Sequence, residues 1–247
     1  MPKKLNYNAV WAEAMALLKV HREAVIAIAG FFLFVGGWVF AYLLPQPDLA
    51  GIETFGGMAD ILNAHFRANW MYIVPAGLVG LYGGLVLYVL LTRRDLPTVG
   101  HALTKAMTFF VQYFLANLLA TFAIVGGLFA FLLPGVYLAG RLAILPAVLA
   151  DEPALGITGS IKRSWEVTKN AGWSVAFIIV CLTIMIWIVS QVAGLMIGLL
   201  CVLVAGPGGI PIIETGFAAL FASIGAVISV ALVVAIYRQL KARTPSQ

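Results

Sequence analysis

The sequence has very few charged residues for its length. Only 10% of its 247 residues are Asp, Glu, Lys or Arg, whereas 62% are hydrophobic, and the mean hydropathy is +1.02. A soluble domain usually carries about 25% charged residues. The composition therefore excludes a soluble globular domain and a disordered chain, and it indicates an all-α polytopic membrane protein.

Residues that commonly bind metals or form disulfides are also scarce. The two cysteines, Cys181 and Cys201, lie far apart within one apolar run, so they cannot pair on a single helix. The three histidines, His21, His65 and His101, lie in separate segments and do not supply a tetrahedral metal site. We therefore expect neither a metal nor another cofactor.

Catalytic signatures are missing as well. The sequence contains no G-x-S-x-G, H-E-x-x-H or G-x-x-x-x-G-K-[ST] motif. The uncharged runs contain serines, but no histidine or lysine at a matching depth and no pair of carboxylates. We therefore expect the protein not to be an enzyme.

The long uncharged runs predict six membrane-spanning helices in a single domain over residues 1–247. A helix rises about 1.5 Å per residue, so about 20 residues cross the roughly 30 Å hydrocarbon core. The spans are expected at residues 24–44, 70–91, 106–132, 136–150, 173–203 and 215–237. Pro134 and Gly135 are expected to separate the third span from the fourth, because proline lacks an N–H donor and glycine favours a turn.

The basic residues predict the orientation. With both termini inside, all of the 15 Lys and Arg residues except Arg67 and Arg141 fall on the cytoplasmic side. Cytoplasmic loops of membrane proteins carry such an excess of basic residues. This distribution predicts a multi-pass membrane protein with N- and C-termini in the cytoplasm, and it accounts for the net charge of +5 without a nucleic-acid partner.

A first amphipathic stretch precedes the first span. Asn8 can cap a helix that runs to Glu23 and places Trp11, Met15 and Leu18 on one stripe. This pattern predicts a helix that lies at the inner membrane surface.

A second amphipathic stretch follows the fourth span. Ile157, Ile161 and Trp165 recur at every fourth position, while Lys162 and Lys169 lie on other faces. Such a helix either lies in the cytoplasmic interface, with Trp165 towards the membrane and the lysines at lipid head groups, or packs against the inner end of the bundle. The two arrangements are compatible.

Arg141 is the charged residue that the composition does not explain. It falls inside the predicted fourth span, where a charge costs at least about 2.5–3.5 kcal/mol. We expect it to face the bundle interior in a polar cluster with Tyr137 of its own span and with Gln112, Tyr113 and Asn117 of the third span. Arg141 then either binds an anion such as a lipid phosphate, or connects helices through neutral amides and carbonyls.

Glycines recur at the spacing that allows close helix packing. Gly80 and Gly84 form one GxxxG pair, and Gly194 and Gly198 form another. We expect these pairs to serve packing within the chain more than association between chains.

The segment from residue 133 to residue 169 resembles the glycerophosphoryl diester phosphodiesterase membrane-domain family, and also the YciC-like uncharacterised inner-membrane proteins. The shared pattern is P-G-x-Y-x₃-R, an acidic turn and an R-S-W amphipathic helix. The matching positions are Pro134, Gly135, Tyr137, Arg141, Ser164 and Trp165. The resemblance implies a membrane fold in the bacterial inner membrane and no catalytic residues here, because the phosphodiesterase chemistry of that family lies in a separate soluble barrel.

These patterns together predict a non-enzymatic integral inner-membrane protein with an accessory or structural role in the bacterial envelope. The alternative is a membrane carrier or lipid-handling protein with a polar site around Arg141. Membrane lipid is the expected partner, and an anionic phospholipid would be the ligand in the second case. The sequence leaves open whether the protein forms a homo-oligomer or binds an unknown membrane partner.

Overall fold

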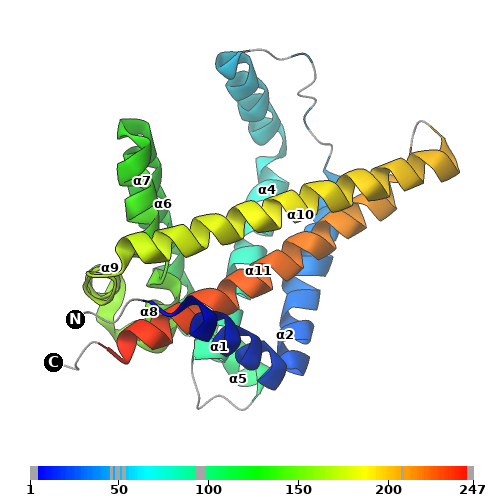
Figure 1. The fold of residues 1–247 in the computed structure, drawn as a ribbon. Coiled ribbons are helices and arrows are strands. Elements are labelled where there is room, and N and C mark those ends of the chain that lie inside the picture. Colours follow the sequence, from blue (N-terminus) through cyan, green and yellow to red (C-terminus); the bar gives the residue numbers. More distant parts are fainter. Residues whose placement is uncertain are drawn as a thin grey trace.

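The computed structural model describes residues 5–44, 47, 51, 54–92, 98–206 and 209–243. Within these ranges the regular structure is helical and contains no strand (Figure 1). Six helical segments in these ranges are long and apolar enough to cross a membrane. The prediction of an all-α polytopic membrane bundle is therefore confirmed.

The helical elements follow one another with short connections. In chain order they are α1 (Tyr7–Val20), α2 (Arg22–Ile28), the π-helical η1 (Ala29–Val35), α3 (Gly36–Leu43), α4 (Phe55–Thr92), α5 (Val99–Thr108), α6 (Phe110–Ala130), α7 (Leu132–Leu142), α8 (Leu145–Asp151), the 3-10 turn η2 (Pro153–Leu155), α9 (Gly156–Val167), α10 (Gly172–Ala205) and α11 (Pro211–Lys241). The first candidate span comprises α2, η1 and α3, and the fourth comprises α7 and α8.

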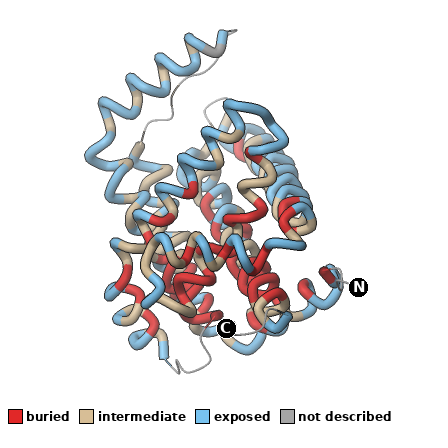
Figure 2. The backbone as a smooth tube through the Cα atoms, turned by 90° about the vertical axis from the view of Figure 1, so that its left-hand side faces the viewer, coloured by how far each residue is buried: buried red, intermediate tan, exposed pale blue. Residues whose placement is uncertain are grey.

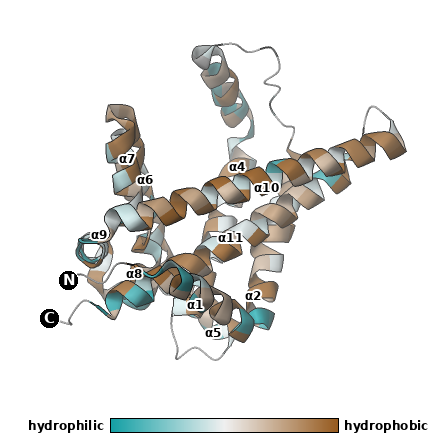
Figure 3. Cartoon of the chain, in the orientation of Figure 1, coloured by the Kyte–Doolittle hydropathy of each residue, from teal (hydrophilic) through white to brown (hydrophobic). Residues whose placement is uncertain are grey.

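The helices converge at one end of the bundle, which we call the basic end. There α1, α5, α8 and α9 pack around the last turns of α4 and α11 (Figure 1). The described basic residues of these helices, of the start of α2 and of the residues just after α9 and α11, apart from Arg67 in the first half of α4, are Lys19, Arg22, Lys105, Lys162, Arg163, Lys169, Arg238, Lys241 and Arg243. Hydrophilic residues gather at this end, and a second hydrophilic group lies at the start of α4 (Figure 3).

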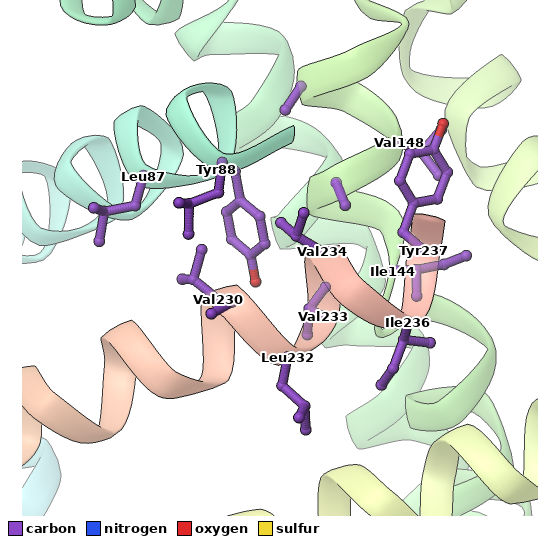
Figure 4. Close-up of a cluster of buried hydrophobic side chains, with 14 of the residues drawn as sticks. Leu87, Tyr88, Ile144, Val148, Val230, Leu232, Val233, Val234, Ile236 and Tyr237 are labelled. Atoms are coloured by element: carbon purple, nitrogen blue, oxygen red, sulfur yellow. The ribbon is translucent and has the colours of Figure 1, made fainter. Parts of the chain in front are cut away.

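The most densely buried part of the chain also lies at the basic end. Residues 85–91 of α4, 147–150 of α8 and 230–237 of α11 are all buried (Figures 2 and 4). Towards the other end the helices separate and their apolar side chains are exposed, as at Leu195 and Leu203 of α10. Lipid tails are as apolar as leucine, so in a bilayer that surface needs no protein cover.

Arg238 of α11 connects three elements at the basic end. Its Nη2 donates a 2.6 Å hydrogen bond to the carbonyl of Leu91, in the last turn of α4, and its Nη1 lies 3.9 Å from the Glu13 carboxylate of α1. The last carbonyls of a helix have no partner within that helix. Arg238 therefore caps α4 while it holds α1 against α11.

A second polar cluster joins the end of α11 to the end of α8. The hydroxyl of Tyr237 donates to Asp151 at 2.7 Å, and Lys241 Nζ lies 2.5 Å from Asp151 and 2.7 Å from Glu152. Arg163 of α9 lies 4.0 Å from Glu152. This cluster, which includes residues far apart in sequence, fixes the turn between α8 and α9 to the end of α11.

The break between the third and fourth spans is not where we predicted it. The chain is extended at Phe131 (φ −163°, ψ 147°), and Pro134 lies in the first turn of α7, where its missing N–H is no loss. Gly135 serves a close approach, because a Cβ there would lie 2.6 Å from the backbone nitrogen of Leu128. Pro134 and Gly135 therefore start the second arm of a tight α6–α7 hairpin.

The fourth span is interrupted, which the prediction of one helix over residues 136–150 missed. α7 ends at Leu142, the chain turns at residues 143–144, and α8 begins at Leu145. Pro146 is the second residue of α8, and in an unbroken helix its ring would clash with the carbonyl of Leu142. Arg141 consequently lies in the last turn of α7, just before the interruption, and not inside a continuous helix.

Other predicted boundaries are also corrected. α4 begins at Phe55 and so extends the predicted span at residues 70–91 by several turns, whereas α6 begins at Phe110 after a break at Phe109. Asn6, not Asn8, caps α1, because its side chain accepts from the Ala9 backbone nitrogen at 3.2 Å.

The face of α1 that packs against the bundle is formed by Val10, Ala14 and Leu17, while Trp11 is exposed. Met15 and Leu18 pack partly against the core. The contact of the Trp11, Met15 and Leu18 stripe with the membrane surface stays a prediction.

The glycines that allow close packing are not the ones in the GxxxG pairs. A Cβ added at Gly80, Gly84, Gly194 or Gly198 would meet nothing within 4 Å among the described residues. At Gly140 of α7, by contrast, a Cβ would lie 2.5 Å from a carbonyl oxygen of α10. The contact between α7 and α10 therefore depends on glycine at position 140.

We predict that Gly140→Ala destabilises the bundle, because overpacking a tight contact costs roughly 1–3 kcal/mol. Gly126→Ala in α6 is the matched control, because open space surrounds it. Thermal unfolding in detergent should show a lower Tm for Gly140→Ala and an unchanged or higher Tm for Gly126→Ala. Equal melting of both variants would contradict the described α7–α10 contact.

Candidate functional site

The candidate site is the place where α7, α9 and the start of α10 meet. Arg141 lies there in the last turn of α7 and is only 2% exposed. α9 packs across the end of α7, and α10 runs back along it. The interruption of the fourth span thus brings a buried positive charge to the basic end of the bundle.

The Arg141 side chain is surrounded by aromatic rings. Its guanidinium carbon lies 4.2 Å from the ring centroid of Trp165 in α9 and 5.7 Å from that of Tyr137, one turn earlier in α7. A cation over an aromatic face gains about 0.5–2 kcal/mol, depending on how far it is desolvated. These contacts offset part of the cost of burying the charge.

The hydrogen-bonding capacity of Arg141 is not satisfied. Within the part of the chain that the structure describes, its buried Nε and Nη1 atoms have no hydrogen-bond partner. A buried donor without a partner costs about 1–3 kcal/mol, and more when the group is charged. No described carboxylate forms an ion pair with Arg141 either.

The backbone of Arg141, in contrast, is firmly held by α9. The hydroxyl of Ser164 donates to the Arg141 carbonyl at 2.8 Å, and that of Thr168 lies 3.4 Å from the same oxygen. Carbonyls in the last turn of a helix lack intrahelical partners, so these hydroxyls cap α7. These hydrogen bonds fix the position of the Arg141 backbone, from which the side chain extends.

A glycine makes room for the stem of Arg141. A Cβ on Gly172, the first residue of α10, would lie 2.7 Å from Arg141 Cδ and 3.2 Å from the ring of Tyr137. The start of α10 can therefore approach α7 only because residue 172 has no side chain.

An open cleft of about 550 Å³ adjoins this arrangement. Its lining residues come from α7, from the α9–α10 turn and from the first turn of α10, namely Leu133, Pro134, Tyr137, Lys169, Asn170, Ala171, Gly172, Trp173 and Ser174. Tyr137 and Gly172 each touch Arg141 and also line the cleft. None of these lining residues is acidic.

The first turn of α10 adds partial positive charge to the cleft. Ala171 is the N-cap and contributes no side-chain hydrogen bond to the 34-residue helix. The first N–H groups of a helix lack intrahelical partners, and the helix dipole makes them favourable for an anion. Together with Lys169 and the neighbouring Arg141, the cleft has the electrostatics of an anion-binding site.

The structure separates three members of the predicted polar cluster from Arg141. Gln112 Nε2 donates to the carbonyl of Pro153 at 3.0 Å, and Asn117 Nδ2 donates to the carbonyl of Tyr113 in its own helix at 2.8 Å. The prediction compared the positions of these residues along the helix axes and assumed an unbroken fourth span. Because the span is broken after α7, residues of α6 that were expected at the level of Arg141 do not lie beside it. Tyr137 does lie against Arg141.

The predicted amphipathic helix exists as α9, and its contact with the membrane interface stays a prediction. Ser160, Ser164 and Val167 are its buried residues, whereas Ile157 and Ile161 are only partly buried. The exposed fraction of Trp165 is 40%, and its ring covers Arg141. Lys162 is exposed, and Lys169, just beyond the helix, lines the cleft.

Thr168, Gly172 and Trp173 were missed as site residues from the sequence, whereas Ser164 was named only through the family resemblance. Ser164 and Thr168 are four residues apart, a spacing that could have indicated a polar helix face. Nothing in the sequence around Gly172 and Trp173 indicates a contact with Arg141, because that contact depends on α10 starting beside α7.

The comparisons add no relative. No protein-family model, no curated protein and no solved structure matches the chain.

Proposed function

We propose that this chain is a non-enzymatic integral protein of the bacterial cytoplasmic membrane that binds an anionic, phosphate-bearing ligand at the Arg141 cleft. The observation that carries the proposal is the buried guanidinium of Arg141, whose Nε and Nη1 have no partner among the described residues. A phosphate accepts two parallel hydrogen bonds from a guanidinium and also supplies the missing negative charge.

The surroundings of Arg141 support an anion over a cation or a neutral ligand. Lys169 and the uncapped first turn of α10 contribute positive charge, and the lining contains no carboxylate. Tyr137 contacts Arg141 and also lines the cleft, so Arg141 adjoins a ligand bound there. Ser164 holds the backbone of Arg141 in place.

A purely structural role for Arg141 is the second candidate, and it corresponds to an accessory protein without a ligand. The stack on Trp165 and the capping of the Arg141 carbonyl favour it. In this case Arg141 joins α7 to α9, and the cleft has no occupant.

The family resemblance is retained as a proposal. Its support is spatial: Tyr137, Arg141, Ser164 and Trp165, which match the pattern at separated positions, meet at one site. Gly135, also part of the pattern, permits the tight α6–α7 contact.

The cytoplasmic location of the basic end is likewise proposed, from the distribution of charge. The described Lys and Arg residues gather there, apart from Arg67 in the first half of α4. Lys3, Lys4, Arg93 and Arg94, which the orientation argument also uses, lie outside the described residues.

We predict that Arg141→Leu removes the bound ligand and leaves the bundle folded, because leucine suits an apolar site and no carboxylate is left unpaired. Arg141→Lys should retain part of the ligand, since an ammonium keeps the charge but not the planar fork. The measurement is phosphorus content per protein after purification, together with Tm. Arg22→Leu, at a side chain 74% exposed, is the control and should retain wild-type phosphorus content.

Two outcomes would overturn the ligand proposal. One is equal phosphorus content in wild type, Arg141→Leu and Arg22→Leu. The second is that none of the proteins contains bound phosphorus and Arg141→Lys has a lower Tm than Arg141→Leu. That result is expected if Arg141 only connects helices.

The orientation is tested by labelling single cysteines after Cys181 and Cys201 are replaced by alanine. Lys162→Cys on α9 should react with an impermeant maleimide only after the cells are permeabilised. Asp60→Cys, in the first half of α4, should react in intact cells, because it lies across the membrane from the basic end. The reverse pattern would contradict the proposed orientation.

A further inference from the structure

The cleft changes character along its length. Its polar part is formed by Lys169, Asn170 and Ser174 around the α9–α10 turn, and its apolar part includes Leu133 and Pro134 in the first turn of α7. On α7 the lining extends from Leu133 to Tyr137, four positions or roughly 6 Å along the helix axis, and Arg141 follows one turn beyond Tyr137. The cleft therefore has an apolar part at the start of α7 and a cationic part at the α9–α10 turn.

The apolar end of the cleft lies among side chains that face away from the protein. Leu133 is 68% exposed, and Phe177, one turn beyond the cleft on α10, is exposed too. Both α7 and α10 belong to candidate membrane spans. A ligand in this cleft thus contacts the basic end with one part and the level of the hydrocarbon with another.

We propose, on the basis of the phosphate-binding function above, that the ligand is a whole membrane phospholipid with a net negative head group. Its phosphate lies on the first turn of α10, beside Lys169 and within reach of Arg141, and an acyl chain follows α7 past Leu133. A free phosphate compound would fill only the polar end of the cleft. The lipid enters sideways from the membrane and not from the aqueous phase.

The lining also selects among head groups. A zwitterionic head group such as phosphoethanolamine carries an ammonium, which needs a carboxylate or another acceptor. The cleft instead presents Lys169 and the N-terminus of α10, with no acidic lining residue, and Arg141 contacts its lining residues Tyr137 and Gly172. Phosphatidylglycerol therefore fits better than phosphatidylethanolamine.

Trp173 and Tyr137 contribute the aromatic part of the cleft lining. Their ring centroids lie 5.4 Å apart in a tilted arrangement, and both residues line the cleft. Aromatic rings of this kind concentrate at the level of lipid head groups. Their position agrees with a phosphate below the rings and an acyl chain above them.

The experiment measures three probes on the purified full-length chain: glycerol 3-phosphate, phosphatidylglycerol and phosphatidylethanolamine. Binding is read as the rise in Tm in detergent and as lipid retained in native mass spectrometry. We expect phosphatidylglycerol to bind in preference to phosphatidylethanolamine and glycerol 3-phosphate to give little stabilisation.

Two matched pairs of variants test the two ends of the cleft. Lys169→Gln should reduce the preference for phosphatidylglycerol roughly fivefold, whereas Lys162→Gln, on an exposed position outside the lining, should not. Leu133→Gln should weaken lipid binding, whereas Leu132→Gln, 70% exposed and not part of the lining, should not.

The failures of the two proposals give different results. Glycerol 3-phosphate that binds as well as phosphatidylglycerol, with both lost in Arg141→Leu, would overturn the lipid inference and leave phosphate binding in place. Phosphatidylglycerol binding that is unchanged in Arg141→Leu would overturn both. Equal retention of the two lipids by wild type would overturn the head-group selectivity.

Discussion

A single buried guanidinium constrains how α7, α9 and α10 meet. Arg141 stacks on Trp165, its carbonyl is capped by Ser164, and its stem requires glycine at position 172. These contacts position the charge but leave two of its donors without partners among the described residues. Burying charged donors without hydrogen-bond partners destabilises the fold, and native proteins that contain such donors commonly have them at functional sites. We therefore assign a ligand to this site.

The rest of the basic end supplies the rigidity that such a site needs. Arg238 caps α4 and holds α1, while Lys241 and Tyr237 fix Asp151 at the end of α8. Because α8 follows the turn after α7, these contacts restrain the chain on the far side of Arg141. In the halves of the spans away from the basic end fewer side chains are buried against protein, and there the apolar side chains would contact lipid.

The membrane class and the six spans could be predicted from composition alone, because a water-soluble fold rarely contains uncharged apolar runs of this length. Arg141 could be singled out for the same reason. Its neighbour Tyr137 could be predicted as well, because it lies one turn away on the same helix. The contacts with other helices could not, since positions were counted along a straight helix that Pro146 interrupts. The cluster of Asp151, Tyr237 and Lys241 could not be predicted either, because nothing local pairs residues so distant in sequence.

The central claim, that Arg141 contacts a phosphate, is tested most directly by solid-state NMR on the full-length protein in native lipid. The chain carries ¹⁵N in the arginine side chains, and the measurement is dephasing of guanidinium nitrogen by ³¹P. Our account predicts a short ¹⁵N–³¹P contact in wild type that disappears in Arg141→Leu. A contact of equal strength in both proteins, or none in either, would contradict it.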